Sequence, residues 1–366
     1  MTASNAQPLR IGYVGCGFMA QKVHLPNLLK TPGVTVTAVA EVRPILGETV
    51  RRRFGIPRAV RDHRELAALA DLDAVAISGH YSGQGEMAID LLKAGKHVFL
   101  EKPMAVSVVQ ADRILAAERA SGKRLMIAYM KRYDAGNRRV KALVDQFRAS
   151  NELGALTFVR NHGFGGDWTA GLDTPFDQTD EPVPPSPSAW PDWLPAAEQN
   201  GYINYLQQYT HNINLMRWFL GGTRENTRVH SVTLGPDGVA GVVVLTINGV
   251  TCSLESGWLS AHGWDEHTQL YFRKGWVKTE APPLLLRNTS ATVELYRAEG
   301  AEKQLSTLHP AERCTWAYAQ EIRHFVECLR SGEPFHSSAQ DALHDVGILE
   351  DIYRMRCGVA EAAVQR

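Results

Sequence analysis

Lys102 is the side chain in this sequence that is best placed for acid–base chemistry. Residues 97–100 read as a short apolar strand, and Glu101, Lys102 and Pro103 follow it directly. Ligands of an open parallel sheet bind beyond the carboxyl ends of its strands, so a lysine there would face a ligand pocket. Burial favours the neutral amine, which can then accept or donate a proton. Pro103 stiffens the exit and can hold a cis bond that fixes where the lysine points. The alternative is a lysine that reaches from a strand end to the surface.

A glycine turn lies at residues 15–20, which read Gly-Cys-Gly-Phe-Met-Ala between a predicted strand and a predicted helix. This is the dinucleotide-binding pattern G-x-G-x-x-A in its expected context. The first glycine permits the tight turn, the second lets the backbone approach a pyrophosphate, and the small alanine lets helix and strand pack closely. Free N–H groups at the helix N-terminus would hold the phosphates. The predicted cofactor contacts in this turn are Gly15, Gly17, Phe18, Met19 and Ala20.

Glu41 ends the second predicted strand, 21 residues beyond Ala20. A carboxylate at this position would accept hydrogen bonds from both ribose hydroxyls of a dinucleotide, and it would repel a 2′-phosphate. NAD is therefore expected in preference to NADP. Arg43 is also expected at the cofactor, where its charge works in favour of NADP. The alternative for Glu41 is an ordinary surface glutamate after a strand.

Two kinds of pattern surround these residues. In the first third of the chain, apolar strands alternate with helices, which indicates a parallel sheet covered on both faces. The predicted strands are 9–15, 34–41, 72–78, 97–101 and 124–130, and the predicted helices are 18–31, 44–53, 63–70, 84–94 and 107–121. This part of the chain is predicted to be a doubly wound α/β domain of the Rossmann type.

Further along, strands follow one another without intervening helices, which predicts an antiparallel sheet. They lie at 228–235, 241–248, 250–260, 267–280 and 291–298, and helical stretches follow at 312–330 and 338–357. Residues 171–195 hold seven of the 18 prolines. Trp168, Trp190 and Trp193 flank that run, and flexible linkers seldom carry tryptophan. We therefore expect an ordered loop that covers something.

The composition excludes several classes of function. The chain has 366 residues, enough for two domains, with 44% hydrophobic and 21% charged residues and a formal net charge of zero. Nucleic acid and anionic membranes are therefore poor partners. The five cysteines form no C-x-x-C pair, so neither a disulfide framework nor a metal site is predicted. The first ten residues lack a secretory signal and no apolar run approaches 18 residues, so a cytoplasmic location is expected.

Three motifs together make the sequence resemble the Gfo/Idh/MocA oxidoreductase family, which includes glucose–fructose oxidoreductase and inositol dehydrogenase. They are GCGFMA at 15–20, GKHVFLEKPMA at 95–105 and THNINLMRWFLGG at 210–222, in the expected order. The resemblance covers nearly the whole chain. It implies a dinucleotide-binding Rossmann domain at 1–131 and a substrate-binding and oligomerisation domain of the α+β class at 132–366. The second domain would hold a large open antiparallel sheet, which packs against a partner subunit in a homodimer or homotetramer.

The resemblance also assigns roles to individual residues. Lys102 matches the catalytic lysine, Glu101 a cofactor-side residue, and His211 the histidine of the second domain, so Lys102 and His211 are the predicted catalytic pair. Ser78 ends the third predicted strand and His80 follows it, at a place where the resemblance implies contact with the cofactor. The predicted substrate contacts are Arg132, Tyr133, His162, Trp168, Gln207, His211 and Tyr318. Among these, Trp168 is included because an aromatic plane can stack on a sugar ring.

The sequence departs from the family pattern at two positions near His211. The usual aspartate, four residues before the histidine, is Gln207, and the usual glycine is Tyr209. An amide can orient an imidazole, but it stabilises the imidazolium far less than a carboxylate does. Proton transfer would then fall more heavily on Lys102 or on a tyrosine.

Three functions are compatible with these residues. The first is an NAD-dependent oxidoreductase acting on a hydroxyl of a sugar, cyclitol or glycoside, in which Lys102 takes the hydroxyl proton while hydride passes to nicotinamide. The second is an NAD-dependent glycosidase of the same family, which oxidises the sugar transiently, eliminates the aglycone, adds water and recycles NAD. The third is a dinucleotide-sensing binding protein, which an intact Glu-Lys-Pro motif disfavours.

Overall fold

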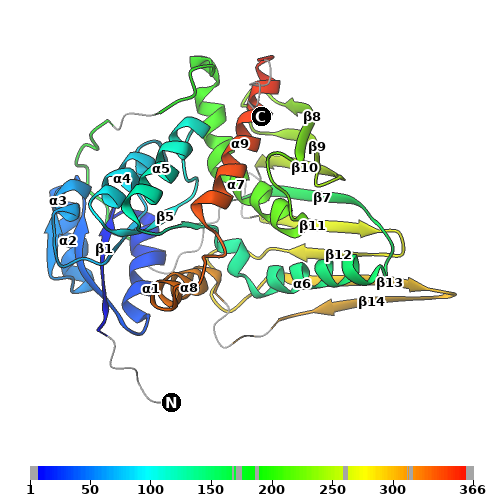
Figure 1. Cartoon of the computed structure of the whole chain (residues 1–366), viewed down its shortest axis with the longest axis horizontal. Helices are drawn as coiled ribbons and strands as arrows, with labels where there is room; N and C mark the ends of the chain where they lie inside the picture. Colours follow the sequence, from blue (N-terminus) through cyan, green and yellow to red (C-terminus); the bar gives the residue numbers. More distant parts are fainter. Residues whose placement is uncertain are drawn as a thin grey trace. The chain divides into compact units, whose positions relative to one another are not determined.

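The computed structural model of the chain describes residues 7–166, 169, 175–185, 189–258, 263–310, 312 and 316–359. The chain forms two compact units (Figure 1). The described residues of the first unit fall within Met1–Ala128, Asp173–Ala189 and Tyr318–Leu343. Those of the second fall within Tyr129–Leu172, Trp190–Ala317 and His344–Arg366. The chain thus passes between the units several times. The division of the chain into two domains, 1–131 and 132–366, stays a prediction.

The first unit is built on a six-stranded parallel sheet in the order β3-β2-β1-β4-β5-β6. Its strands are β1 (Leu9–Val14), β2 (Val34–Ala40), β3 (Arg58–Val60), β4 (Ala74–Ile77), β5 (His97–Glu101) and β6 (Leu125–Ala128). Its helical connections are η1 (Ala20–His24), α1 (Leu25–Lys30), α2 (Pro44–Phe54), α3 (His63–Ala67), α4 (Tyr81–Lys93) and α5 (Val108–Ser121). The predicted doubly wound sheet is confirmed. Only the short β3, which has three residues, was not expected from the sequence.

Local chemistry explains where these elements begin and end. All four residues of β4 are buried, as are those of β6, which suits strands covered on both faces. The Asp62 carboxylate caps α3 by accepting hydrogen bonds from the N–H groups of Arg64 and Glu65, at 2.9 and 3.0 Å. Gly122 ends α5 in the left-handed conformation, as is common after a helix.

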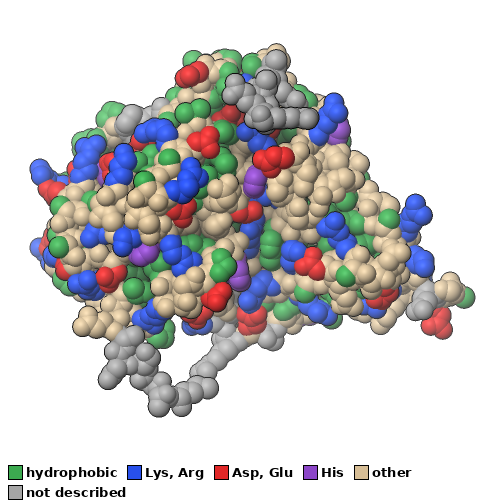
Figure 2. Space-filling view, in the orientation of Figure 1, with side chains coloured by type: hydrophobic (Ala, Val, Ile, Leu, Met, Phe, Trp, Pro, Cys, Tyr) green, Lys and Arg blue, Asp and Glu red, His purple; other side chains and the backbone are tan. Residues whose placement is uncertain are grey.

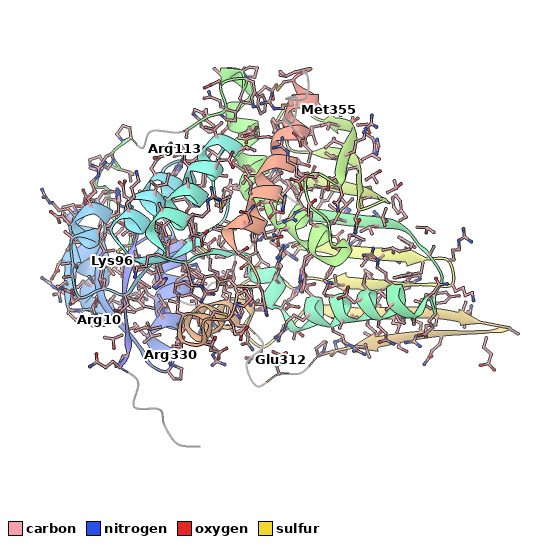
Figure 3. All side chains as sticks on the ribbon, in the orientation of Figure 1. Arg10, Lys96, Arg113, Glu312, Arg330 and Met355 are labelled. Carbon is pink, nitrogen blue, oxygen red and sulfur yellow. The ribbon has the colours of Figure 1, made fainter. Side chains whose placement is uncertain are left out.

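The C-terminal part of the chain returns to this first unit. Helix α8 (Ala317–Ser331) ends near the start of β2, and Arg330 lies in its last turn (Figure 3). The Arg330 guanidinium donates a hydrogen bond of 2.7 Å to the Gly33 carbonyl, just before β2. Ser337 then lies against β6, where the Ile127 N–H donates to its carbonyl at 2.9 Å and its hydroxyl donates back to the Ile127 carbonyl at 2.6 Å. A segment more than 200 residues away in sequence therefore completes the unit that holds Lys102.

The second unit holds an eight-stranded sheet in the order β14-β13-β12-β11-β7-β10-β9-β8. Only β7 and β10 run parallel, and the other neighbours are antiparallel. The strands are β7 (Leu156–Gly165), β8 (Thr227–Leu234), β9 (Gly241–Ile247), β10 (Val250–Trp258), β11 (Asp265–Phe272), β12 (Gly275–Glu280), β13 (Thr292–Glu299) and β14 (Glu302–Leu308). The predicted α+β unit with a large, mostly antiparallel sheet is confirmed.

Helices lie against this second sheet. Helix α6 (Ala135–Ser150) packs on β12 and β13, and α7 (Gln199–Leu220) packs on β7, β9 and β10. The short η2 (Met130–Tyr133) and η3 (Ala196–Glu198) precede them, and α9 (Ala339–Arg356) ends the described chain. The run 267–280, expected as one strand, is the hairpin of β11 and β12, because the chain turns at residues 273–274.

The charge distribution and the helix lengths both agree with the composition. Acidic and basic side chains are interspersed over the face drawn in Figure 2, as a net charge of zero would suggest. Within the part of the chain that the structure describes, the helices are all too short or too polar to cross a membrane.

Candidate active site

The glycine turn after β1 has the geometry that a bound dinucleotide requires. Gly15 adopts φ +90°, and a Cβ built on it would lie 2.7 Å from the Ser78 carbonyl oxygen, so only glycine fits. A Cβ on Gly17 would meet no described atom within 4 Å. Neighbouring protein therefore does not require glycine at this second position, whereas the close approach of an external pyrophosphate would. Ala20 is fully buried, as helix–strand packing demands. The residues of the turn thus fit the phosphates of NAD.

Glu41 lies beside this turn, as predicted. Its carboxylate accepts a hydrogen bond of 2.7 Å from the Cys16 N–H, which fixes it against the glycine turn. The Arg43 guanidinium donates to both Glu41 oxygens, at 2.7 and 3.2 Å, and the Arg43 N–H donates at 3.2 Å. The two cofactor candidates of opposite charge therefore form one ion pair, and Glu41 is only 6% exposed.

Ser78 and His80 follow β4 at the point where the strand order reverses. Ser78 accepts a hydrogen bond of 2.7 Å from the Tyr13 hydroxyl, and its carbonyl packs against Gly15. His80 is exposed and caps α4, with its Nδ1 2.6 Å from the Ser82 hydroxyl. Ser78 is thus held at the glycine turn. His80 caps the N-terminus of α4, in addition to its predicted contact with the cofactor.

The backbone around Lys102 is held from both sides. The side-chain amide of Gln84, which is 1% exposed, donates hydrogen bonds of 2.7 Å to the carbonyls of both Glu101 and Pro103. The Lys102 N–H donates to the Glu101 carboxylate at 3.1 Å, and the Lys102–Pro103 bond is cis. Gln84 on α4 therefore fixes the turn from which the lysine side chain projects.

The surroundings of Lys102 favour a neutral amine. Burial lowers the pKa of Lys102 below its ordinary value, while the carboxyl groups of Glu101 and Glu321 act in the opposite direction. Burial also raises the pKa of Glu321 well above its usual range, and the charge of Glu101 adds to this effect. The pKa of Lys102 is therefore set by burial acting against the charges of two neighbouring carboxyl groups, Glu101 and Glu321.

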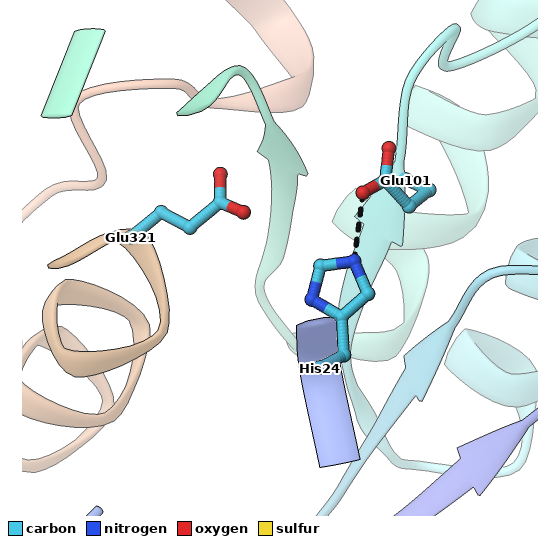
Figure 4. A group of neighbouring side chains, drawn as sticks. All are labelled: His24, Glu101 and Glu321. Carbon is cyan, nitrogen blue, oxygen red and sulfur yellow. Dashed lines mark hydrogen bonds and ion pairs between the residues drawn. The ribbon is translucent and has the colours of Figure 1, made fainter. Parts of the chain in front are cut away.

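Glu101, His24 and Glu321 form a buried cluster (Figure 4). His24 Nε2 lies 2.7 Å from a Glu101 oxygen, and the Glu321 carboxyl group points toward this pair from α8. Among the described residues, neither Glu321 oxygen nor His24 Nδ1 has a hydrogen-bond partner. Tyr318, one turn earlier on α8, places its ring edge-on to His24 with the centroids 6.2 Å apart. The predicted Tyr318 thus belongs to the same cluster.

This cluster has the donor atoms of a metal site, but two of its side chains lie at a hydrogen-bond distance. One ligand atom from each of the three side chains lies within 4.8 Å of the others. Two ligands of tetrahedral zinc are about 3.3 Å apart, given zinc–nitrogen and zinc–oxygen bonds of about 2.0 Å. The 2.7 Å between His24 and Glu101 is shorter and is a hydrogen-bond distance. We therefore treat His24 and Glu101 as a hydrogen-bonded pair, with the Glu321 carboxyl group beside it.

In the second unit, His211 lies on α7 and is 7% exposed. Its ring is edge-on to Tyr129, with the centroids 6.3 Å apart, and the Tyr129 hydroxyl lies 2.9 Å from the Thr210 hydroxyl. Gln207, one helical turn earlier on the same face, donates a hydrogen bond of 3.1 Å to the Asn204 side chain of its own helix.

Arg132 and Tyr133 lie inside the second unit. Arg132 donates a hydrogen bond of 2.7 Å to Asn214 on α7, and its guanidinium lies 5.9 Å from the centre of the Trp218 ring. Asn214 in turn donates to Asp345 at 2.7 Å. Both Arg132 and Tyr133 are less than 5% exposed. These contacts anchor α7, and any contact of Arg132 with substrate would come on top of this role.

His162 lies on a different face from His211. On β7, Asn161 accepts a hydrogen bond of 2.8 Å from Asn212 of α7, so the next residue points to the opposite face of the sheet. There His162 Nδ1 is 2.6 Å from Glu255, and its ring stacks on His267 with the centroids 4.9 Å apart. Arg160 and His162 hold the pKa of Glu255 at about 2. The structure therefore does not bring His162 and His211 together, and Trp168 lies outside the described residues.

Comparison with known proteins places the chain among the enzymes that its motifs resemble. Residues 9–129 match the Gfo/Idh/MocA family model, described as an oxidoreductase family with an NAD-binding Rossmann fold. The match covers the Rossmann part of the chain, residues 9–129 of 366. The chain is 27% identical over 348 residues to inositol 2-dehydrogenase of Burkholderia cenocepacia (strain HI2424), covering 91% of this chain and 89% of that relative. Its matching residues form an NAD-binding Rossmann fold of an oxidoreductase family, and its curated relatives are named dehydrogenases, such as myo-inositol 2-dehydrogenase of Thermotoga maritima.

Two solved structures share the fold over nearly the whole chain. A 3-ketoreductase from Actinomadura kijaniata, in complex with NADP and TDP-benzene, superposes with a TM-score of 0.72 at 22% identity, over 96% of this chain and 98% of that one. The apo scyllo-inositol dehydrogenase from Lactobacillus casei gives a TM-score of 0.69 at 20% identity, over 96% and 97%. Because the first of these carries NADP, the fold itself does not decide between the two dinucleotides.

One departure from the family pattern now has a physical reason. Tyr209 stands where relatives have glycine, and it is fully buried against the sheet. Its hydroxyl accepts a hydrogen bond of 2.8 Å from the Gly257 N–H and lies 3.0 Å from the Gly163 carbonyl. Tyr209 thus ties α7 to β7 and β10, which is a structural role.

Three side chains near Lys102 were missed by the sequence analysis. Gln84, His24 and Glu321 were not singled out from the sequence. A signal was available for Glu321, because it lies three residues after Tyr318 on a predicted helix and so shares its face. His24 offered none, since its partner Glu101 is 77 residues away in sequence.

Proposed function

We propose that this enzyme oxidises a secondary hydroxyl of a cyclitol or sugar, with Lys102 as the general base and NAD as the hydride acceptor. The observation that carries the proposal is the turn at the end of β5. There Gln84 fixes the backbone on both sides of Lys102, and burial lowers the pKa of its amine. A base whose position and protonation are both controlled is what removal of a hydroxyl proton requires.

The individual steps follow from the chemistry of the residues. Lys102 in its neutral form would accept the hydroxyl proton as the carbon–hydrogen bond breaks. Bound NAD would supply the electron-deficient nicotinamide ring, and Gly15, Gly17, Glu41 and Ser78 would hold the dinucleotide. The carboxyl groups of Glu101 and Glu321 would stabilise the ammonium ion that forms on Lys102. His211 is proposed to hydrogen-bond the substrate, with Gln207 orienting it in place of a carboxylate.

The class of substrate is proposed from the relatives. The curated relatives include inositol 2-dehydrogenase and myo-inositol 2-dehydrogenase of Thermotoga maritima, whose names specify a cyclitol. A ring with several hydroxyl groups also suits histidine and amide side chains as binding partners, because each can donate and accept hydrogen bonds. We therefore propose a polyhydroxylated six-membered ring. The glycosidase alternative gains no support from relatives that are named dehydrogenases.

The direct test is a balance of cofactor against product. The purified protein would be incubated with NAD and a panel of inositols, free sugars and glycosides, while NADH is followed by absorbance and the ketone by mass spectrometry. One NADH for each ketone, with any glycosidic bond intact, supports the proposal. Release of an aglycone with NAD required but not consumed would support the glycosidase instead.

We also propose a homodimer or homotetramer that associates through the second sheet. The face of that sheet opposite α7 carries partly exposed aromatic and charged side chains on neighbouring strands, including Phe158, Arg160, Tyr271 and Trp276. Such a mixture is typical of protein interfaces. Light scattering on the native protein and on a Trp276→Glu variant would test the assembly.

The four described cysteines are free thiols, which suits the proposed cytoplasmic location.

A further inference from the structure

The proline-rich segment is anchored on the first unit at the helices that follow the glycine turn. Asp177 pairs with Arg53 at 2.9 Å, and its backbone exchanges two hydrogen bonds with the Gln21 side chain, at 2.8 and 2.9 Å. The ring of Phe176 is edge-on to Phe18 of the glycine turn, with the centroids 5.3 Å apart. The sequence predicted that this segment is ordered and covers something, and its described part covers this region.

The same segment delivers a carboxylate to the N-terminus of α2. The two oxygens of Glu181 accept hydrogen bonds from the N–H groups of Ile45 and Leu46, at 2.9 and 3.0 Å. The Thr179 hydroxyl donates to the same carboxylate at 2.8 Å. Glu181 thus binds the positive end of an 11-residue helix in the way that a phosphate would.

Glu181 accepts hydrogen bonds from all of the backbone N–H groups in the first turn of α2 that have no partner within the helix. Pro44 has no N–H, and the Gly47 N–H already donates to the Arg43 carbonyl at 2.9 Å. The N–H groups of Ile45 and Leu46 are the remaining two, and both are bound by Glu181. The anion site that a helix N-terminus normally offers is therefore filled from within the chain.

This occupied anion site adjoins the place expected for the adenosine ribose. Helix α2 begins three residues after Glu41, and a Cβ on Gly47 would lie only 3.2 Å from the Glu41 Cβ. Glu41 is the residue that would accept the ribose hydroxyls. A 2′-phosphate on that ribose would need cationic or N–H partners nearby, and Arg43 and the N–H groups of α2 are two such partners beside Glu41. Arg43 is bound by Glu41, and the N–H groups are bound by Glu181.

We propose that Glu181 is a specificity-determining residue, which excludes NADP by occupying the site that the 2′-phosphate would take. This inference rests on the proposed function in so far as it assumes that a dinucleotide binds at the glycine turn. It assigns NAD preference to two carboxylates from distant parts of the chain. Glu41 binds the Arg43 guanidinium, and Glu181 binds the N–H groups at the start of α2, so neither is available to a 2′-phosphate.

The ionisation of Glu181 agrees with this role. Burial alone would raise the pKa of Glu181, but hydrogen bonds from Ile45, Thr179 and Leu46 and the charge of Arg43 outweigh that effect and lower the pKa below its ordinary value. The group is therefore a carboxylate at neutral pH. A phosphate brought to the same N–H groups would meet its negative charge directly.

The test compares the binding of NAD and NADP in variants at this position, followed by tryptophan fluorescence. Glu181→Gln removes the charge but keeps an oxygen acceptor, and Glu181→Ala also frees the two N–H groups. Relative to NAD, NADP should bind roughly fivefold more tightly in the first variant and roughly thirtyfold in the second, on the scale of one short-range charge interaction. Glu48→Gln is the matched control, because it removes a carboxylate from the same helix at a pair with Arg51. It should leave the ratio unchanged.

The outcomes separate this inference from the proposed function. If the wild-type protein binds NAD and the ratio does not move in either Glu181 variant, the inference is wrong while the proposed function stands. Equal weakening of both dinucleotides would also overturn it, since Glu181 would then only hold the loop. If the wild-type protein binds neither dinucleotide, the proposed function fails. Adding 2′,5′-ADP and 5′-AMP as competitors isolates the phosphate, and only the first should gain affinity in Glu181→Ala.

Discussion

The two units of this enzyme differ in how they treat the residues predicted for its site. In the first unit, Glu41, Ser78 and Lys102 come from the ends of three parallel strands or directly after them, and each is held by a buried or partly buried hydrogen bond. In the second unit, His162 and His211 are separated onto opposite faces of a sheet. Arg132 is occupied within a buried network there.

The difference follows from the geometry of the two sheets. The strands of a parallel sheet all end at the same edge, so a polar residue at any strand end is a reasonable candidate for one shared site. In an antiparallel sheet, successive residues point to opposite faces, so a change of one position in register reverses the role of a side chain. Sequence position alone is therefore a better guide to function in the first unit than in the second.

The largest contrast is expected between the two histidines of the second unit. His211→Ala should lower kcat/KM by roughly 10²-fold, which is within the range for loss of a catalytic or polar substrate contact. His162→Ala should change it by no more than a few fold, because His162 lies on the other face with Glu255 and His267. Steady-state kinetics on both variants checks this. Equal losses would show that the face of the sheet does not determine which histidine takes part.

In the first unit, Gln84→Ala should lower kcat by roughly tenfold without changing NAD affinity. Its amide holds the carbonyls on both sides of Lys102, and small displacements of a catalytic group are costly in rate. The matched control is Gln110→Ala, which removes another buried glutamine that contacts the Val106 N–H. Both variants should lose about 1–3 kcal/mol of unfolding free energy, measured by urea denaturation. A control that also slows turnover would mean that the rate reports general destabilisation.

Glu321→Gln should alter the pH dependence of stability. The folded-state pKa of Glu321 is raised by burial, so its contribution to stability is complete below the unfolded-state pKa and is lost as pH rises through the folded-state pKa. Glutamine cannot ionise and escapes this loss. The melting temperature of the variant should therefore gain on that of the wild type as pH rises above about 4.5, the ordinary pKa of a glutamate. Parallel melting curves against pH would show that Glu321 does not titrate in this range.

The same change should have a small effect on the pH profile of turnover. Lys102 must be neutral to accept a proton, so activity rises with pH through its pKa. Because the charge of Glu321 raises that pKa, Glu321→Gln should move the rise in kcat to lower pH. A rise that moves to higher pH, or does not move, would separate Glu321 from Lys102.

The fold and half of the site could be predicted from particular patterns. The glycine turn, Glu41 and the Glu-Lys-Pro motif are local, and the context of strand and helix around them is visible in the sequence. The contacts of Glu181 with α2 could not be predicted, because they join residues 135 and 136 positions apart and depend on how a proline-rich loop folds back. The same holds for Glu321, which lies near the end of β5 only because α8 returns to the first unit, and for His24, whose partner Glu101 is 77 residues away.

The central claim is that Lys102 transfers the proton in an NAD-dependent oxidation, and single-turnover reduction of NAD in Lys102→Met tests it most directly. The rate of NADH formation should fall by roughly 10²–10⁴-fold, the usual contribution of a general base, while the Kd for NAD stays within a few fold. Lys96→Met is the matched control, because Lys96 is also buried but donates to the carbonyls of Leu69 and Leu72, away from the end of β5. That variant should lose stability and keep its rate. Wild-type NADH formation in Lys102→Met, or an equal loss in both variants, would contradict the claim.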